Sequence, residues 1–405
     1  MTSCGQKSDV DNAQGAVRVD VPLQKNSETF TFKTIQLFGI DSLKEVSGKF
    51  VQFFYTPGAE GSTIVGDAPK ARFIKKGDRF IPMDAISNRM SVIYYHLQNM
   101  AQLDDLVGAA GINHWPRVVG LDTILANVSE SDKKNNAFYD GYTDSMMFLP
   151  YTANELPIAA NGGVIAHEHF HSLFYKIVMK PALKNKNLNL NQKQVASIHD
   201  FKAQNDRVVF RGAKILPANL ELNNSQVASL VNRADLMGIN EGLADFWAWI
   251  YSDDANYIRW SIPSEKVARS LELDQQEEGH FKSTLDIKTY IRYLQNVSLN
   301  PSENLSSYYY IIGTPHARFL RQLTLVMSEE SKQNVSEVKV KVAGKVIQFL
   351  QSLSKQVAEA QSEQVLNADS LFAFFSEDQS LANTKACDLV LKYVNKKSCG
   401  ATTHP

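Results

Sequence analysis

Residues 162–175 read Gly-Gly-Val-Ile-Ala-His-Glu-His-Phe-His-Ser-Leu-Phe-Tyr. The apolar residues on both sides of the charged centre predict a helix that is buried nearly all round. His167 and His171 are four residues apart, so they share one face of such a helix, where two neutral imidazoles can hold one Zn²⁺. Glu168 is placed to reach a water on the metal rather than the metal itself. His169 points about 200° away from His167 and is expected to serve in packing.

A third metal ligand is expected from residues 240–250, which read Asn-Glu-Gly-Leu-Ala-Asp-Phe-Trp-Ala-Trp-Ile. Glu241 and Asp245 are four residues apart on an otherwise apolar helix, and buried carboxylates must be paired or bound to a metal. A catalytic zinc has three protein ligands and one open position, so we predict Glu241 as the third ligand. Asp245 is predicted to accept the free ring N–H of His167 and to orient that ring. The alternative is an amphipathic helix with two acids that face solvent.

The order of these motifs resembles that of the gluzincin metallopeptidases, and within them the thermolysin-like and fungalysin-like clan. Both have HExxH followed by a helix with Glu and, four residues later, Asp. The resemblance covers about residues 85–330. It implies one catalytic Zn²⁺, Glu168 as the general base and a peptide or protein substrate.

Two further segments carry the resemblance. Residues 135–141, Asn-Asn-Ala-Phe-Tyr-Asp-Gly, resemble the edge strand of that family, which implies that Asn136 and Ala137 bind the substrate chain. Residues 310–320, Tyr-Ile-Ile-Gly-Thr-Pro-His-Ala-Arg-Phe-Leu, resemble the later segment in which a His opens a helix and stabilises the oxyanion. The resemblance implies that role for His316, and the alternative is an ordinary residue at the start of a helix.

One long segment departs from the family pattern. Glu241 follows His171 by 70 residues, far more than the family usually has. Residues 179–232 are therefore predicted to be an insertion, rich in Asn, Gln and Lys. It displaces the region where the family carries a Tyr and calcium ligands, so that Tyr cannot be assigned and calcium is not evident.

Composition narrows the class of protein. A chain of 405 residues with 44% hydrophobic and 10% aromatic residues can bury a sizeable core, as one large or two ordinary domains. Its net charge of −1 provides no basic field for nucleic acid or an anionic membrane surface. No run approaches the roughly 18 apolar residues of a transmembrane segment.

The cysteines bear on the compartment. Residues 1–6, Met-Thr-Ser-Cys-Gly-Gln, resemble the end of a bacterial lipoprotein signal, although the basic and apolar regions of a full signal do not precede them. Either the chain begins at the end of that signal or Cys4 is incidental; we favour a lipid anchor at Cys4 and an exported protein, in the cell envelope or secreted. Export would allow a disulfide between Cys387 and Cys399, but a helix reaching about residue 395 would require the tail to fold back.

The hydrophobic pattern predicts an α+β fold. We expect a disordered tether (1–17), a β-rich N-terminal region (18–82), an α/β subdomain ending in the metal-binding helix (83–178), the insertion (179–232) and an α-helical C-terminal lobe (233–400). In this thermolysin-like arrangement the zinc lies in the cleft between a mixed sheet and the helical lobe.

The sequence therefore predicts a zinc-dependent endopeptidase that hydrolyses peptide bonds with a metal-activated water and with Glu168 as general base. The alternative is a cell-envelope binding or adhesion lipoprotein on a peptidase-like scaffold, with little or no hydrolytic activity. An exopeptidase would need an acidic or aromatic anchor for a free terminus, and no marked motif supplies one.

Overall fold

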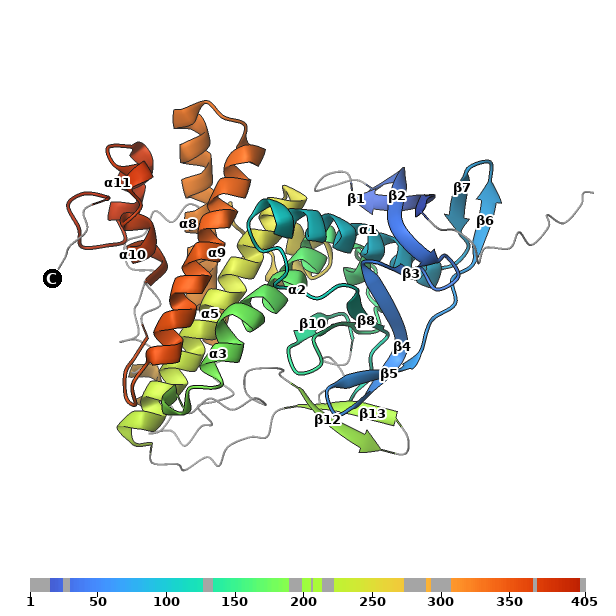
Figure 1. The fold of residues 1–405 in the computed structure, drawn as a ribbon, viewed down its shortest axis with the longest axis horizontal. Helices are drawn as coiled ribbons and strands as arrows, with labels where there is room; N and C mark the ends of the chain where they lie inside the picture. Colours follow the sequence, from blue (N-terminus) through green and yellow to red (C-terminus); the bar gives the residue numbers. More distant parts are fainter. Residues whose placement is uncertain are drawn as a thin grey trace, which may run out of the picture.

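The computed structural model describes residues 15–24, 30–126, 134–188, 199–204, 207–212, 222–272, 289–292, 307–366 and 370–400. Figure 1 shows the strands at one side of the molecule and the long helices at the other. The predicted α+β fold, β-rich at the N-terminus and helical toward the C-terminus, is confirmed. Among the described residues, no helix has both the length and the apolar character that crossing a bilayer requires.

The N-terminal sheet has the strand order β3-β2-β1-β7-β6. Its strands are β1 (Gly15–Gln24), β2 (Phe30–Ser42), β3 (Ser47–Gly48), β6 (Phe73–Lys76) and β7 (Arg79–Pro82). In β1 the valines at 17, 19 and 21 are buried and alternate with more exposed residues, as a strand with one face on the core requires. Residues 15–17, predicted to belong to the tether, are therefore part of this sheet, while Cys4 lies outside the described residues.

A second, mixed sheet has the order β10-β11-β8-β4-β5. Its parallel strands are β4 (Val51–Glu60), β8 (Arg117–Leu121) and β11 (Ser145–Phe148); β5 (Thr63–Asp67) and β10 (Ala137–Asp140) are antiparallel edges. Because β4 and β5 join this sheet, it crosses the predicted boundary between residues 82 and 83.

The predicted insertion at 179–232 contains a β-hairpin and the start of a long helix. The hairpin is formed by β12 (His199–Gln204) and β13 (Arg207–Gly212), and β13 pairs with β9 (Leu125–Ala126). Helix α5 (Asn224–Ser252) begins inside the segment, with a capping box in which Asn223 and Gln226 bond each other's backbone N–H groups. Helix α5 therefore begins before residue 232, where the predicted insertion ends.

The longer of the remaining helices lie on both sides of α5 in the sequence. They are α1 (Ala85–Leu106), α2 (Gly162–Phe174), α8 (Ser307–Ser331), α9 (Val335–Glu359), α10 (Ser370–Ser376) and α11 (Lys385–Leu391). Helix α2 continues through a π-helical segment (Tyr175–Met179) into the short α3 (Lys180–Ala182).

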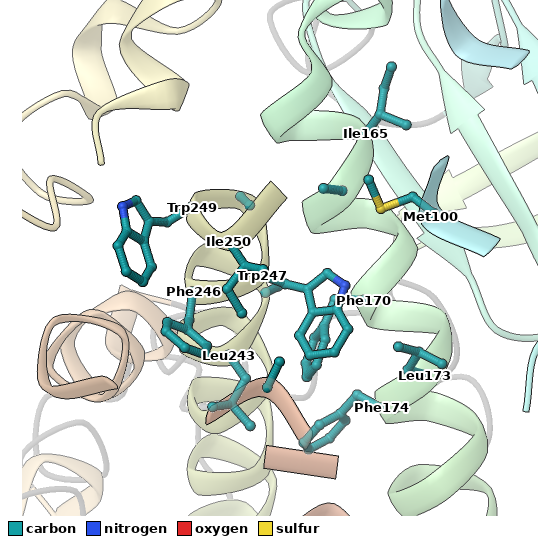
Figure 2. Close-up of a cluster of buried hydrophobic side chains, with 14 of the residues drawn as sticks. Met100, Ile165, Phe170, Leu173, Phe174, Leu243, Phe246, Trp247, Trp249 and Ile250 are labelled. Atoms are coloured by element: carbon teal, nitrogen blue, oxygen red, sulfur yellow. The ribbon is translucent and has the colours of Figure 1, made fainter. Parts of the chain in front are cut away.

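Aromatic packing holds α2 against α5 (Figure 2). The ring of Phe170 on α2 lies 5.0 Å from that of Trp247 on α5, and both side chains are fully buried. Leu173 and Phe174 on α2 and Leu243 on α5 are also fully buried in the same core. This contact joins two segments far apart in sequence, each of which carries a predicted metal-binding face.

Glycine residues let α5 and α8 cross at very short distance. A Cβ built on Gly242 would lie 2.6 Å from the carbonyl carbon of Gly313 and closer still to its oxygen. A Cβ on Gly313 would lie 2.6 Å from the backbone nitrogen of Gly242. Only residues without a Cβ allow this crossing, which brings the first turn of α8 beside Glu241.

Cys387 and Cys399 form a disulfide, with their Cα atoms 5.8 Å apart. Helix α11 ends at Leu391, earlier than the residue 395 that the pattern predicts. The tail beyond it folds back, so that the backbone N–H of Cys399 donates to the sulfur of Cys387.

Candidate metal centre and cleft

The first turn of α2 is fixed from outside the helix. The Asn161 side chain caps it by accepting from the N–H groups of Gly163 and Val164. Its amide also donates to the carbonyl of Tyr257, at 2.9 Å. A Cβ on Gly163 would lie 2.6 Å from the Tyr257 ring, so glycine is needed where Tyr257 packs on the helix. The start of α2 and the segment around Tyr257 are therefore held as one unit.

Three donor atoms from α2 and α5 converge on one point. The Nε2 atoms of His167 and His171 are 3.0 Å apart. The Oε2 atom of Glu241 lies 3.3 Å from Nε2 of His167 and 3.8 Å from Nε2 of His171. A tetrahedral ion with bonds of about 2.0–2.1 Å holds its ligand atoms about 3.3 Å apart, so the spacing fits such an ion.

His167, Glu168 and His171 also form a group whose possible ligand atoms all lie within 4.8 Å of one another. This group could hold a metal ion. It does not include Glu241, although the Glu241 oxygen is the closer third atom to both imidazoles. We take Glu241 as the third ligand because its Oε2 is buried and accepts no hydrogen bond from any described residue, despite the 3.3 Å approach of His167. A buried carboxylate oxygen without a donor is what a cation would satisfy.

In each of the two histidines a neighbouring side chain contacts the Nδ1 atom, so the Nε2 atom points toward the donor cluster. Nδ1 of His171 lies 3.0 Å from Oδ1 of Asn240. Nδ1 of His167 lies 3.0 Å from Oδ1 of Asp245, so the structure places Asp245 where the sequence predicts it. Hydrogen bonds of this kind fix the ring orientation and tautomer of metal-binding histidines.

Asp245 is itself neutralised by a buried arginine. Arg269 reaches it with two nitrogens, at 2.5 and 3.3 Å, and the hydroxyl of Tyr257 donates to it at 2.6 Å. Arg269 holds the pKa of Asp245 well below its usual range, although burial acts in the opposite direction. The carboxylate that orients His167 therefore stays ionised.

The metal-binding donors differ in their proton affinity. Burial opposes a charge on His167, but the neighbouring carboxylates of Asp245 and Glu241 outweigh it and raise its pKa to about 9. Burial lowers the pKa of His171 to about 4. Burial acts to raise the pKa of Glu241, but the two histidines hold it at about 2. A metal ion would meet an ionised Glu241 and a neutral His171, and would displace a proton from His167.

Glu168 is held at the edge of this cluster. Burial raises its pKa to about 7, with a further contribution from the nearby charge of Glu241 and an opposing one from His167. The backbone N–H of Tyr139, in the edge strand β10, donates to its carboxylate. A carboxyl group that titrates near neutral pH can both accept and return a proton.

A cleft opens over these groups, bounded by β10, α2, α5 and the first turn of α8. Its lining includes His167, Glu168, His171 and Glu241. Asn136 and Ala137 also line it, at the start of the edge strand. The structure therefore brings all the predicted site residues but one together around this cleft. Asp245 lies behind the cleft.

The exception is His316, which is not among the residues that line the cleft. The prediction that it opens a helix is wrong: α8 begins at Ser307 and runs through Pro315, so His316 lies in the helix interior. Its side chain is fully buried, with Nδ1 2.7 Å from the carbonyl of Ile312 and the ring stacked on Phe372 at 5.0 Å. It serves the packing of α8 against α10.

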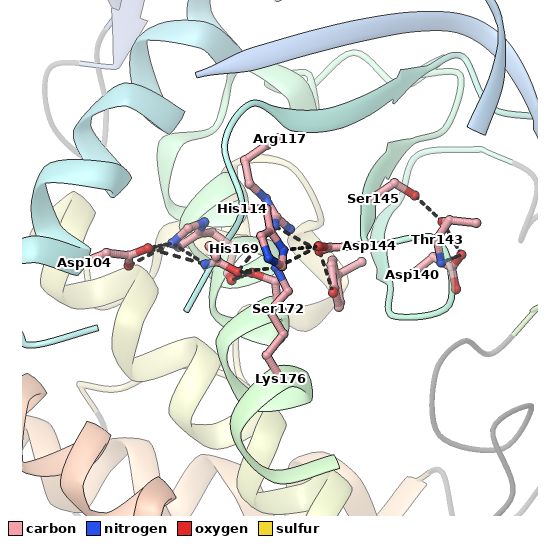
Figure 3. Close-up of polar contacts among 12 residues, drawn as sticks. Asp104, His114, Arg117, Asp140, Thr143, Asp144, Ser145, His169, Ser172 and Lys176 are labelled. Atoms are coloured by element: carbon pink, nitrogen blue, oxygen red, sulfur yellow. Dashed lines mark hydrogen bonds and ion pairs between the residues drawn. The ribbon is translucent and has the colours of Figure 1, made fainter. Parts of the chain in front are cut away.

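His169 faces away from the metal-binding cluster, into a network of buried polar residues (Figure 3). Its Nε2 lies 3.0 Å from Oδ1 of Asp104 on α1, and its ring stacks on Trp115. This is the packing role that its place on the helix predicts.

The same network ties the turn after β10 to α2. Asp144 accepts from Arg117 at 3.0 Å and from Lys176 at 2.7 Å. It also accepts from the hydroxyl of Tyr139 at 2.9 Å. Because the backbone of Tyr139 contacts Glu168, this network fixes the edge strand relative to the cleft.

Sequence reasoning missed three residues of the site. Tyr257 and Arg269 bind Asp245, and Tyr310 of α8 hydrogen-bonds to Glu241. The ring of Tyr310 also lies 4.5 Å from the Arg269 guanidinium. One signal was present: a carboxylate expected in an apolar helix requires a cationic partner, and Arg269 is such a cation.

No model of a known protein family matches the chain, and a search of curated proteins finds no significant match.

Proposed function

We propose that the chain is a zinc-dependent endopeptidase of the gluzincin type. One observation carries the proposal: two imidazole nitrogens and the orphaned oxygen of Glu241 converge from helices that are distant in sequence. Nitrogen and oxygen donors in a set of three suit a catalytic zinc site that keeps one open position. The buried pair of Asp245 and Arg269 behind His167 supports the same conclusion, because it orients the His167 ring. A histidine that served only in packing would not need such an orientation.

When bound, zinc supplies a Lewis acid that polarises the scissile carbonyl and acidifies a water. Proton transfer and positioning depend on residues of this chain. Glu168 accepts the proton of the attacking water and returns it to the amine that leaves, a role typically worth about 10²–10⁴ in rate. The backbone N–H of Tyr139 keeps its carboxylate in place.

The edge strand is the proposed binding surface for the substrate chain. β10 pairs with β11 on one side only, and Asn136 and Ala137 at its start line the cleft. An extended peptide can add to such an edge through backbone hydrogen bonds that do not depend on its side chains. Binding along the middle of a chain favours cleavage within it, hence an endopeptidase.

The Cys387–Cys399 disulfide supports an exported location, because disulfides persist in oxidising compartments. A lipid anchor at Cys4 is part of the same proposal. Mass spectrometry of the protein purified from membranes would detect acylation there, and an unmodified Cys4 would remove the anchor.

The test combines metal content with hydrolysis. Purified protein should contain one zinc per chain and cleave internally quenched peptides, and a chelator should abolish the cleavage. Glu168→Gln should keep the zinc and lose about 10²–10⁴ in rate, whereas the exposed Glu337→Gln on α9 should change neither. Undiminished activity in Glu168→Gln would remove Glu168 from its role. Bound zinc without hydrolysis of any peptide would favour the alternative, a binding or adhesion protein.

A further inference from the structure

Within the described parts of the chain, one charged residue of the cleft has no counter-ion. Among the described residues the cleft lining includes two arginines, Arg233 and Arg269. Arg269 is paired with Asp245, whereas Arg233 forms no ion pair with any described residue. It hydrogen-bonds to the hydroxyl of Tyr309, a neutral group, and its Nε atom is buried without a hydrogen-bond partner. A neutral phenol does not compensate a partly buried positive charge.

Arg233 lies on the face of α5 that carries the metal ligand. Residues 233, 237 and 241 are successive steps of four along the helix, and all three line the cleft. Eight residues at 1.5 Å each place the Cα of Arg233 about 12 Å from that of Glu241 along the axis. An extended peptide advances about 3.3 Å per residue, so Arg233 faces the substrate within about four residues of the cleaved bond.

The charges of the cleft favour an anionic ligand at this place. Asp245 is paired with Arg269 and Glu241 faces the two histidines, so among the described residues no carboxylate of the cleft pairs with Arg233. A guanidinium binds a carboxylate through two parallel hydrogen bonds, which a phosphate-free peptide can offer only from an acidic side chain or its C-terminus.

We propose that Arg233 binds a substrate carboxylate, making this cleft selective for peptides with an acidic group within about four residues of the cleaved bond. The inference rests on the proposed peptidase function. The two sources of the carboxylate, an Asp or Glu side chain and a free C-terminus, predict different substrates. The first gives an endopeptidase with an acidic subsite, and the second gives an enzyme that trims short C-terminal fragments.

Two peptide series distinguish these sources. In the first, a quenched peptide with an amidated C-terminus carries Glu in place of Gln at each position within four residues of the cleaved bond. In the second, the C-terminus is free or amidated at the same distances. We expect kcat/KM to rise about tenfold or more when the carboxylate replaces its neutral counterpart at one of these positions. The Arg233→Gln variant should lose that preference. The exposed Arg18→Gln, on β1, is the matched control and should keep it.

A binding measurement separates this inference from the proposed activity. Fluorescence anisotropy of the same labelled peptides on Glu168→Gln protein should give about tenfold tighter binding of the carboxylate peptide, weakened by added salt. Arg233→Lys keeps the charge but loses the two-pronged contact, so its preference should be intermediate, which also guards against a Gln variant that does not fold. Equal rates and equal affinities for charged and neutral peptides in the unmodified cleft would overturn the inference. If no peptide is hydrolysed but the carboxylate peptide still binds more tightly than the neutral one, only the peptidase proposal is overturned.

Discussion

Replacing Gly242 by alanine tests whether the crossing of α5 and α8 builds the metal site. The added Cβ would lie 2.6 Å from the Gly313 carbonyl carbon, a contact with backbone that no side-chain rotation can relieve. The helices must therefore move apart. Tyr310 lies on α8 one turn before Gly313 and hydrogen-bonds to Glu241, so the movement reaches the proposed third metal ligand directly.

A second glycine provides the matched control. Gly344 lies inside α9, and a Cβ there would meet only the carbonyl oxygen of Val107, at an ordinary 3.5 Å. Both substitutions gain up to about 1 kcal/mol of helix propensity. Only Gly242→Ala adds an overpacking cost of about 1–3 kcal/mol or more. Because the helix propensity gain is common to both substitutions, the two variants should differ by the overpacking cost alone, about 1–3 kcal/mol or more.

Thermal unfolding measures this difference. An unfolding entropy of about 2.1 cal/mol/K per residue gives roughly 0.85 kcal/mol/K for the whole chain, so Gly242→Ala should melt about 1–4 °C below Gly344→Ala. Zinc affinity, measured by competition with a chelator, should fall in Gly242→Ala and stay unchanged in Gly344→Ala. Equal melting temperatures would refute the close crossing. A lower melting temperature with unchanged zinc affinity would refute its link to Glu241.

Two further predictions concern buried charges. Asp245→Asn leaves the Arg269 guanidinium without a counter-charge and weakens the orientation of His167, so zinc affinity should fall about 10- to 100-fold, while the exposed Asp78→Asn should leave it unchanged. Burial acts to raise the pKa of Asp144, but Arg117 and Lys176 lower it below its usual range. A depressed pKa contributes stability above the unfolded pKa and loses it as pH falls, so between about pH 5 and pH 3 urea unfolding should show a smaller loss of stability in Asp144→Asn than in the parent. Parallel pH profiles would contradict that role for Asp144.

Local periodicity was sufficient for the helices that carry the metal ligands. His167 and His171, and Glu241 and Asp245, are pairs four apart in apolar surroundings, and the structure places each pair on α2 or α5. The start of α8 was predicted wrongly, because the resemblance places the beginning of a helix at His316, whereas α8 begins at Ser307 and runs through Pro315. Packing of Gly313 against α5 holds the preceding turns in helical form, and this tertiary contact overrides the local signal of the proline.

The parts of the site that the sequence did not reveal come from segments without a repeating pattern. Tyr257 lies in a short 3₁₀ helix, and Arg269 lies in a turn. Neither position is marked by periodicity, since each is chosen by the need to compensate a buried carboxylate across space. The types of partner that Asp245 needs, a cation and a hydrogen-bond donor, could be expected from the sequence. The positions in the chain that supply them could not.

The hydrogen bonds around the two histidines distinguish a ligand set from a packed polar cluster. In a packed cluster each buried donor and acceptor finds a partner within the cluster, because unpaired polar groups are costly. Here both Nδ1 atoms are partnered from outside the cluster, by Asn240 and by Asp245, so the Nε2 atoms can only face each other and Glu241. Two ring nitrogens at 3.0 Å share at most one proton, and Oε2 of Glu241 still accepts no hydrogen bond from the described part of the chain. A cation would replace that proton, relieve the contact between the rings and satisfy the carboxylate oxygen at once. The arrangement of these atoms therefore favours a metal site over a packed polar cluster.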